Sequence, residues 1–179
     1  TLSLAFAAGE TVTCTVTPDD GEDTGTALSD SVTIGNTPPE VTSVTLSPST
    51  VFTHDTITAS VSTDDADGDS VSVSHAWTVD GSPVSETGST LDGATYFDRD
   101  QVVVVVVTPN DGIDDGSTLT STALTISNTA PEAPGISITP EEPAGGADDL
   151  LCQVDSDSPD DDGDAISYTC GWEGDGVTY

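Results

Sequence analysis

Basic residues are almost absent from this sequence, which has 33 acidic side chains, one arginine (Arg99), no lysine and a formal net charge of −32. Phosphate binding needs Lys and Arg, so the composition excludes nucleic acid and an anionic membrane surface as partners. A chain with this charge repels itself unless cations, salt or wide spacing of the charges weakens the repulsion. The charge therefore favours bound cations, a salty environment or an extended shape.

Other absences restrict the function further. No apolar stretch is long enough to cross a bilayer, so we expect no membrane insertion in this segment. The only histidines, His54 and His75, belong to no catalytic motif, and no serine lies in a nucleophile elbow. We therefore expect no enzyme. Three cysteines with no methionine and almost no cationic side chains favour an extracellular protein.

One sequence module occurs twice, at residues 63–81 and 157–176. Each copy has an acidic turn around a glycine, then alternating residues that end in tryptophan, then a Gly-containing turn. Alternation with period 2 is typical of a half-buried strand. The inward positions of the two strands are Val71, Val73, His75 and Trp77, and Ile166, Tyr168, Cys170 and Trp172.

The spacing of strands and turns predicts the fold. Seven short strands within residues 41–128, separated by turn residues, indicate an antiparallel sandwich of immunoglobulin type. The junction NTPPE at residues 36–40 returns as NTAPE at 128–132, 92 residues later. We predict an all-β chain of tandem immunoglobulin-like, seven-stranded antiparallel β-sandwiches, with one repeat per junction spacing and no helices. The expected strands include residues 1–6, 91–97, 119–126 and 166–172.

The predicted domains are unequal. Residues 1–37 are the C-terminal half of one repeat (strands E, F and G), 38–129 are a complete repeat, and 130–179 are the N-terminal half of another (strands A, B and C). A half-sandwich exposes its core, so a neighbouring segment or subunit should complete it. Either the polypeptide continues through further repeats, which we favour, or separate subunits complement each other's strands.

The motifs DADGD…HAW…DG and DDDGD…CGW…DG, with the TPxDG turn and the NTxPE junction, resemble the PKD-type and cadherin-like tandem repeats of large bacterial surface proteins. The resemblance covers nearly the whole chain. It implies an immunoglobulin-like fold and a location outside the bacterial cell or on its surface. The chain departs from the PKD pattern after Trp77 and lacks the full cadherin linker.

The acidic turns are candidate calcium sites, because Ca²⁺ takes six to eight oxygen ligands in irregular geometry. The candidate ligands are Asp64, Asp65, Asp67, Asp69, Asp157, Asp160, Asp162 and Asp164. Further ligands expected at the junctions are Glu40, Asp98, Asp100 and Glu132. The alternative is that these are solvated turns in which Asp is common for its turn preference. The loops are not EF-hands, since the helices and the twelfth-position Glu are missing.

The cysteines lie at inward positions of the two half-repeats. In sandwiches of this type the usual disulfide joins strands B and F beside the tryptophan. This predicts that Cys14 pairs with the equivalent of Cys152 in a neighbouring segment. The alternatives are a local Cys152–Cys170 bridge or three buried free thiols.

A run of six valines fills residues 102–107. Val103, Val105 and Val107 should face inward, which leaves Val102, Val104 and Val106 on the outer face. An outward valine row indicates either β-propensity or a lateral contact.

Together these patterns predict a structural, non-enzymatic segment of an extracellular fibre, filament or stalk, whose partner is itself, head-to-tail with neighbouring repeats or subunits. The alternative is an adhesin that recognises a carbohydrate or protein through loops such as residues 81–88 and 110–116.

Overall fold

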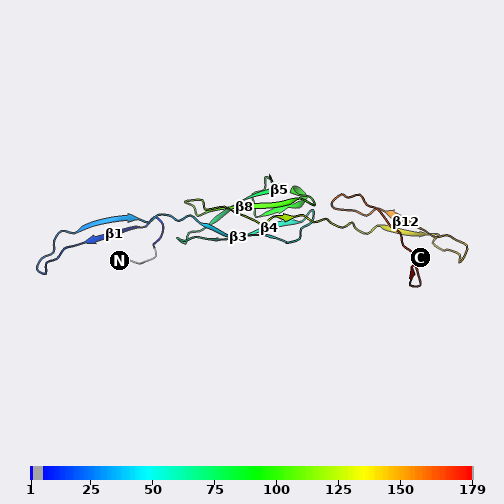
Figure 1. Ribbon diagram of the computed structural model, residues 1–179, viewed down its shortest axis with the longest axis horizontal. Coiled ribbons are helices and arrows are strands. Elements are labelled where there is room, and N and C mark those ends of the chain that lie inside the picture. The colour runs from blue at the N-terminus through cyan, green and yellow to red at the C-terminus, as the bar shows by residue number, and fades with distance from the viewer. Residues whose placement is uncertain (2–5, 179) are drawn as a thin grey trace.

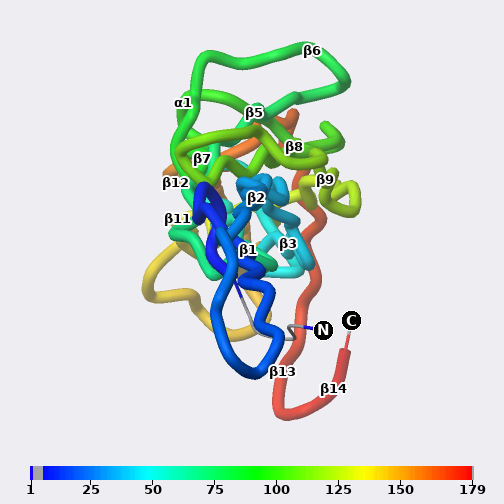
Figure 2. The backbone as a smooth tube through the Cα atoms, turned by 90° about the vertical axis from the view of Figure 1, so that its left-hand side faces the viewer, coloured from blue at the N-terminus to red at the C-terminus, as the bar shows by residue number. Residues whose placement is uncertain are grey.

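The computed structural model describes residues 1 and 6–178, and it is an all-β chain of three units in line (Figure 1). Viewed along the long axis, the two end units lie before and behind the central one (Figure 2). An extended arrangement separates the acidic side chains, which weakens the self-repulsion of a chain of this charge.

The N-terminal unit is one antiparallel hairpin of β1 (Thr11–Val16) and β2 (Leu28–Thr33). One face is polar, and hydroxyl groups pair across it, with Thr13 and Ser31 2.9 Å apart and Thr15 and Ser29 2.7 Å apart. The other face is apolar, and no sheet of the described chain covers it, so that Val16 is 64% and Leu28 80% exposed. The apolar face of the hairpin is therefore exposed in the described chain.

The central unit is a sandwich of two antiparallel sheets. The first has the order β3 (Glu40–Ser47), β4 (Thr56–Asp64), β7 (Thr90–Asp92). The second has the order β10 (Leu124–Thr125), β8 (Val102–Asn110), β5 (Ser72–Val79), β6 (Ser82–Pro83), and β9 (Leu119–Thr120) also pairs with β8. In the second sheet, β5 pairs antiparallel with β8, and this pairing places Trp77 opposite Val105.

The core of the described chain lies between these two sheets. Alternation on β8 buries Val103, Val105 and Val107 completely, as the sequence predicts. They share one apolar cluster with Ile57 and Ala59 of β4 and with other buried residues that include Trp77, Leu91 and Ile126. The indole of Trp77 donates a hydrogen bond to the Gly88 carbonyl at 2.9 Å, which satisfies its only polar atom.

The C-terminal unit consists of β11 (Gly135–Thr139), β12 (Leu151–Ser156) and a small terminal hairpin of β13 (Glu173–Gly174) and β14 (Val177–Thr178). Strands β11 and β12 pair antiparallel, with Ile138 opposite Cys152. This register matches that of β3 and β4, where Leu46 lies opposite Ala59. Ile136 and Ile138 are 62% and 51% exposed, so in the described residues no second sheet covers this face of β11–β12 either.

The all-β, antiparallel character is confirmed, but several predicted strands differ. Residues 166–172 form no strand, and residues 119–126 divide into β9 and β10. The strand predicted at 91–97 is short β7 followed by a single helical turn, α1 (Gly93–Tyr96), against the expectation of no helix. Gly93 permits this turn, since a Cβ there would lie 2.6 Å from the Phe97 ring and 2.7 Å from the Asp55 carbonyl oxygen. The strand expected at 1–6 falls largely on residues 2–5, outside the described part.

Among the described residues, no helix combines the length and hydropathy required to span a membrane.

Candidate metal centres at the unit junctions

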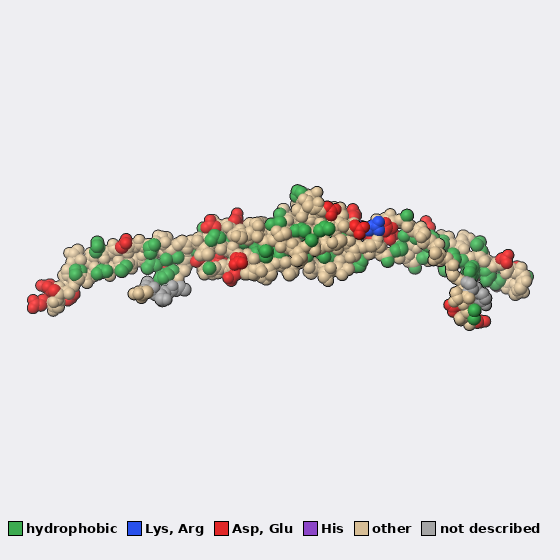
Figure 3. All heavy atoms as spheres, in the orientation of Figure 1, with side chains coloured by type: hydrophobic (Ala, Val, Ile, Leu, Met, Phe, Trp, Pro, Cys, Tyr) green, Lys and Arg blue, Asp and Glu red, His purple; other side chains and the backbone are tan. Residues whose placement is uncertain are grey.

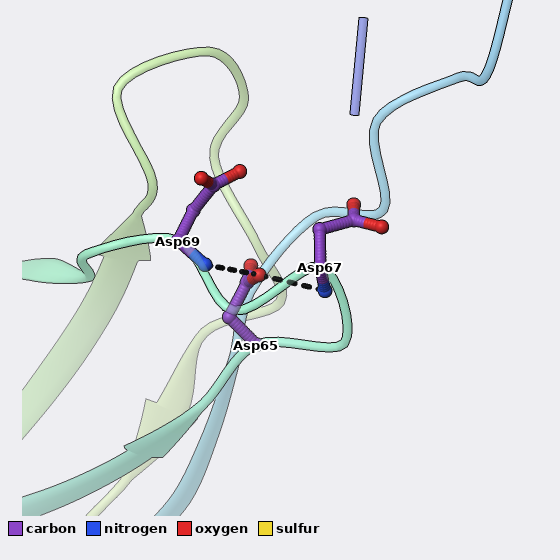
Figure 4. A group of neighbouring side chains, drawn as sticks. All are labelled: Asp65, Asp67 and Asp69. Atoms are coloured by element: carbon purple, nitrogen blue, oxygen red, sulfur yellow. Dashed lines mark hydrogen bonds between the residues drawn. The ribbon is translucent and has the colours of Figure 1, made fainter. Parts of the chain in front are cut away.

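The first acidic loop connects β4 to β5 and is held together by one carboxylate. Oδ1 of Asp65 accepts hydrogen bonds from the backbone N–H of Asp67 at 2.9 Å and of Asp69 at 3.0 Å (Figure 4). Gly68 supplies the positive φ of 82° that closes the turn. One carboxylate oxygen from each of the three aspartates lies within 4.8 Å of the others. The loop therefore gathers three carboxylates, which are hard oxygen donors, on one short turn.

The second acidic loop repeats this geometry in the C-terminal unit. Oδ1 of Asp160 accepts from the N–H of Asp162 at 3.1 Å and of Asp164 at 3.0 Å, and Gly163 has a φ of 73°. These three carboxylates also bring oxygens within 4.8 Å of one another. The repeated motif of the sequence is thus a repeated turn in the structure.

Each loop binds the linker that leads into its own unit. The backbone N–H of Thr37 donates to Oδ2 of Asp67 at 2.7 Å, and that of Thr129 donates to Oδ2 of Asp162 at 2.5 Å. The middle aspartate of each loop therefore fixes the linker against the loop. The linkers carry the recurring NTxPE sequence, which explains why loop and junction recur together.

A further acidic loop, between β8 and β9, joins the first junction. Nδ2 of Asn36 donates to Oδ2 of Asp111 at 2.9 Å and to Oδ2 of Asp114 at 3.0 Å. The hydrogen bond from Asn36 lowers the pKa of Asp111 below its ordinary value, together with a bond from the backbone N–H of Asp114. Asn36 thus connects the linker to a second acidic loop of the central unit.

The second junction includes side chains of the preceding unit. Arg99 donates through Nη1 to Oδ1 of Asn128 at 2.7 Å and to Oδ2 of Asp164. The single basic side chain of the protein is visible among acidic ones in Figure 3. The Thr53 hydroxyl lies near the Asp162 carboxylate and lowers its pKa, although its oxygen has no partner in hydrogen-bonding geometry. The second loop therefore lies against the central sandwich.

Buried oxygen atoms without hydrogen-bond partners gather at the two junctions. In the described part of the chain they are Oδ1 of Asn36 and Oδ2 of Asp65 at the first, and Oγ1 of Thr53, Oγ1 of Thr129, Oδ2 of Asp160 and Oδ1 of Asp162 at the second. Thr53 is only 5% exposed. A cation would satisfy these oxygens, and a set made only of carboxylate, amide and hydroxyl oxygens fits Ca²⁺.

The structure does not bring together all of the predicted ligands. It groups Asp65, Asp67 and Asp69, and separately Asp160, Asp162 and Asp164, whereas Asp64 and Asp157 lie outside both groups. The junction ligands expected from the sequence also lie outside the two groups, and all of them are exposed: Glu40, Asp98, Asp100 and Glu132. The sequence did not identify Asn36, Asn128, Thr53 or Arg99. The sequence does contain a signal for the two asparagines, because each is the first residue of an NTxPE junction.

The three cysteines are free thiols in the structure. Cys152 and Cys170 are neighbours in the C-terminal unit without a disulfide between them. Burial, and then the proximity of Cys170, raises the pKa of the Cys152 thiol. Cys14 is exposed on the open face of β1, in the unit at the other end of the molecule (Figure 1).

The outer valines, Val102, Val104 and Val106, are half-buried on the outer face of β8. Their lateral contact stays a prediction.

Comparison of the chain with protein-family models, with curated proteins and with solved structures finds no match.

Proposed function

We propose that this chain is a structural, non-enzymatic segment of an extracellular bacterial repeat protein that forms a fibre, filament or stalk. Its repeats would be immunoglobulin-like. Support comes from the central unit, in which β3, β4 and β7 form one sheet and β5, β8 and β10 lie in the other. This matches the A–B–E and C–F–G division of immunoglobulin-type sandwiches, whereas the fourth strand, β6, pairs with β5 and does not join the first sheet.

Hydrogen bonds at matching positions support a tandem repeat. At the corner before β8, Asp98 N–H bonds to Gln101 Oε1 at 2.7 Å, and Asp100 N–H bonds to the Ile126 carbonyl at 2.9 Å. The corner before β1 has the same two bonds, from Ala7 N–H to Glu10 Oε2 at 3.3 Å and from Gly9 N–H to the Ile34 carbonyl at 3.0 Å. On this basis β1–β2 is equivalent to β8 with the strands that follow it.

The two incomplete units have complementary parts. The N-terminal hairpin corresponds to one layer of the central sandwich, and β11–β12, by its register, corresponds to β3–β4 in the other layer. Their exposed apolar faces include Val16, Leu28, Ile136 and Ile138. We propose that each is completed head-to-tail by the matching half in a neighbouring repeat or subunit.

Calcium at the junctions is the second part of the proposal. The paired loops, the linker N–H bonds and the buried oxygens lacking donors all support a role for Ca²⁺ in fixing each linker. A divalent ion would also offset part of the charge of −32. In such a rod calcium would act mechanically, by preventing the joints from bending.

The observation that carries the proposal is the linear arrangement of three units through two junctions with the same linker contact. Electron microscopy of the chain in calcium should show straight rods or longer filaments. Compact or randomly bent particles would contradict the proposal. Binding of the segment to a carbohydrate or protein through residues 81–88 or 110–116 would instead favour the adhesin alternative.

A further inference from the structure

The loop between β1 and β2 has the shape of the loop between β8 and β9. Oδ1 of Asp20 accepts from the backbone N–H groups two and three residues further on, at 3.0 and 2.8 Å, and Oδ1 of Asp111 does the same at 2.7 Å for both. A bond between a carbonyl and an N–H closes each loop, at 2.8 Å in the first and 2.9 Å in the second. Asp20 therefore matches Asp111, and Asp23 matches Asp114.

The β8–β9 loop holds a linker, whereas the β1–β2 loop does not in the described chain. The two carboxylates of the β8–β9 loop accept from Nδ2 of Asn36, and the linker backbone lies so close that a Cβ on Gly116 would be 1.7 Å from the Pro39 carbonyl oxygen. At the matching Gly25 the nearest atoms belong to the loop itself. The β1–β2 loop lies at the outer end of its unit, away from the central sandwich (Figure 1).

The second junction has the complementary part. Asn128 is the equivalent of Asn36, but the C-terminal unit has no equivalent of the β8–β9 loop in the described chain. Nδ2 of Asn128 donates to the carbonyl of the adjacent Thr129 at 2.8 Å, while its Oδ1 accepts from Arg99 at 2.7 Å. The amide of Asn128 therefore lacks the carboxylate partners that Asn36 has.

Residues 167–174 are the equivalent of β5. The β13–β14 hairpin has the register of the β5–β6 hairpin, and each turn is an Asp-Gly pair whose aspartate has a φ of 50°. Trp172 therefore takes the place of Trp77, which lies opposite Val105 in the pairing of β5 with β8. Residues 166–172 have no strand partner in the described chain.

The free edge of β1 is the matching partner. Strand β1 pairs with β2 in the register of β8 with β9, which puts Cys14 at the place of Val105. Within the described residues β1 pairs with no other strand, so it leaves unpaired the edge that β8 uses for β5. An unpaired edge presents a row of N–H and C=O groups to another strand.

We propose that β1 of one chain pairs with residues 167–174 of a second copy, with Cys14 opposite Trp172, and that Asp20 and Asp23 bind the amide of Asn128 of that copy. The proposal rests on the head-to-tail completion proposed above and adds its register and its contact at the junction. The strand pairing extends the sheet, and the asparagine fixes the linker of one chain to the loop of the next.

This register is physically consistent. The inward side chains of the two strands lie beside one another, Trp172 beside Cys14 and Cys170 beside Val16. A slip by one residue would turn the inward side chains of residues 167–174 to the polar face. Glu173, the only acidic residue of that strand, lies opposite a threonine. No two carboxylates therefore face each other directly in the pairing, which favours association of chains that each have a charge of −32.

Paired cysteines test the register in a chain whose three native cysteines are changed to alanine. Residues directly opposite in an antiparallel pair have Cα atoms about 4.5–5.5 Å apart, which a disulfide can span, whereas those two residues out of register are about 7–8 Å apart. With glutathione disulfide, Thr13→Cys/Glu173→Cys and Thr15→Cys/Gly171→Cys should form linked multimers. The exchanged pairs, Thr13→Cys/Gly171→Cys and Thr15→Cys/Glu173→Cys, use the same four exposed positions and should remain monomers.

Asn128→Asp tests the contact at the junction. It keeps an oxygen for Arg99 but replaces the amide donor by a carboxylate that faces Asp20 and Asp23 of the other copy. Sedimentation equilibrium should show association weakened by about tenfold or more. Asn36→Asp makes the same change of charge at the occupied junction within the chain and should leave association unchanged.

The outcomes separate this inference from the proposed function. If multimers form and the exchanged pairs cross-link as well as the matched pairs, the register is wrong while head-to-tail association stands. If Asn128→Asp associates as the unchanged chain does, the junction contact is wrong. If every variant and the unchanged chain are monomers at millimolar concentration, completion of the end units by a second copy is wrong as well.

Discussion

Calcium at about a hundred times its dissociation constant should raise the melting temperature of the central sandwich by on the order of 10–20 °C over the chelated protein. An ion that binds only the folded state contributes about 2.7 kcal/mol at that concentration. For a domain of this size each kcal/mol shifts the midpoint by about 4–8 °C. The first loop connects β4 and β5, one from each sheet, so its stability is coupled to the core.

Circular dichroism melts with calcium, with magnesium and with a chelator measure this shift. Asp65→Asn/Asp67→Asn should remove most of it, because it removes two of the three grouped carboxylates of the loop. Asp64→Asn/Asp157→Asn removes the same charge from positions outside both groups and should keep it. Equal midpoints in calcium and chelator at low salt would show that the loops are solvated turns.

Oxidation by glutathione disulfide should convert the chain into a ladder of disulfide-linked multimers. In the central unit the positions equivalent to Cys152 and Cys14 are Ala59 and Val105, which lie in one buried cluster from opposite sheets. Docking of β1–β2 of one copy on β11–β12 of the next would bring the two thiols together. The thiols then give up two protons and two electrons to form the S–S bond, and glutathione disulfide is reduced to two glutathione molecules.

Non-reducing gel electrophoresis distinguishes this pairing from its alternative. Cys14→Ser should abolish the ladder, and Cys170→Ser should leave it intact. The ladder should also lengthen as protein concentration rises, because the contact joins separate chains. If Cys14→Ser has no effect and the product is an internally bridged monomer, the disulfide is Cys152–Cys170. The docking of half-sandwiches would then have no support from the cysteines.

Residue alternation was sufficient to predict the two long paired strands of the second sheet. Strand β8 follows the valine run as predicted, and β5 ends beyond Trp77. Residues 166–172 have the same pattern as β5 but form no strand. The reason is that β5 pairs with β8 along its whole length, and the C-terminal unit has no equivalent of β8 in the described chain. A strand pattern becomes a strand only when another strand satisfies its backbone.

The acidic turns could be predicted because their contacts are local. Asp65 bonds to residues two and four positions away, and Asp160 does the same. The contacts that complete the sites are not local. Arg99 and Asp164 are 65 residues apart, and Asn36 and Asp111 are 75 apart. Such contacts depend on how the units meet, which periodicity and composition do not specify.

The central claim, that the end units are the two halves of one sandwich, can be tested with a rearranged chain. Residues 130–179 would be joined through a short Gly/Ser linker to residues 1–37 and expressed alone. We predict one cooperative thermal transition and, after oxidation, a Cys14–Cys152 disulfide identified by mass spectrometry. A chain that shows no cooperative transition, or that bridges Cys152 to Cys170, would contradict the account.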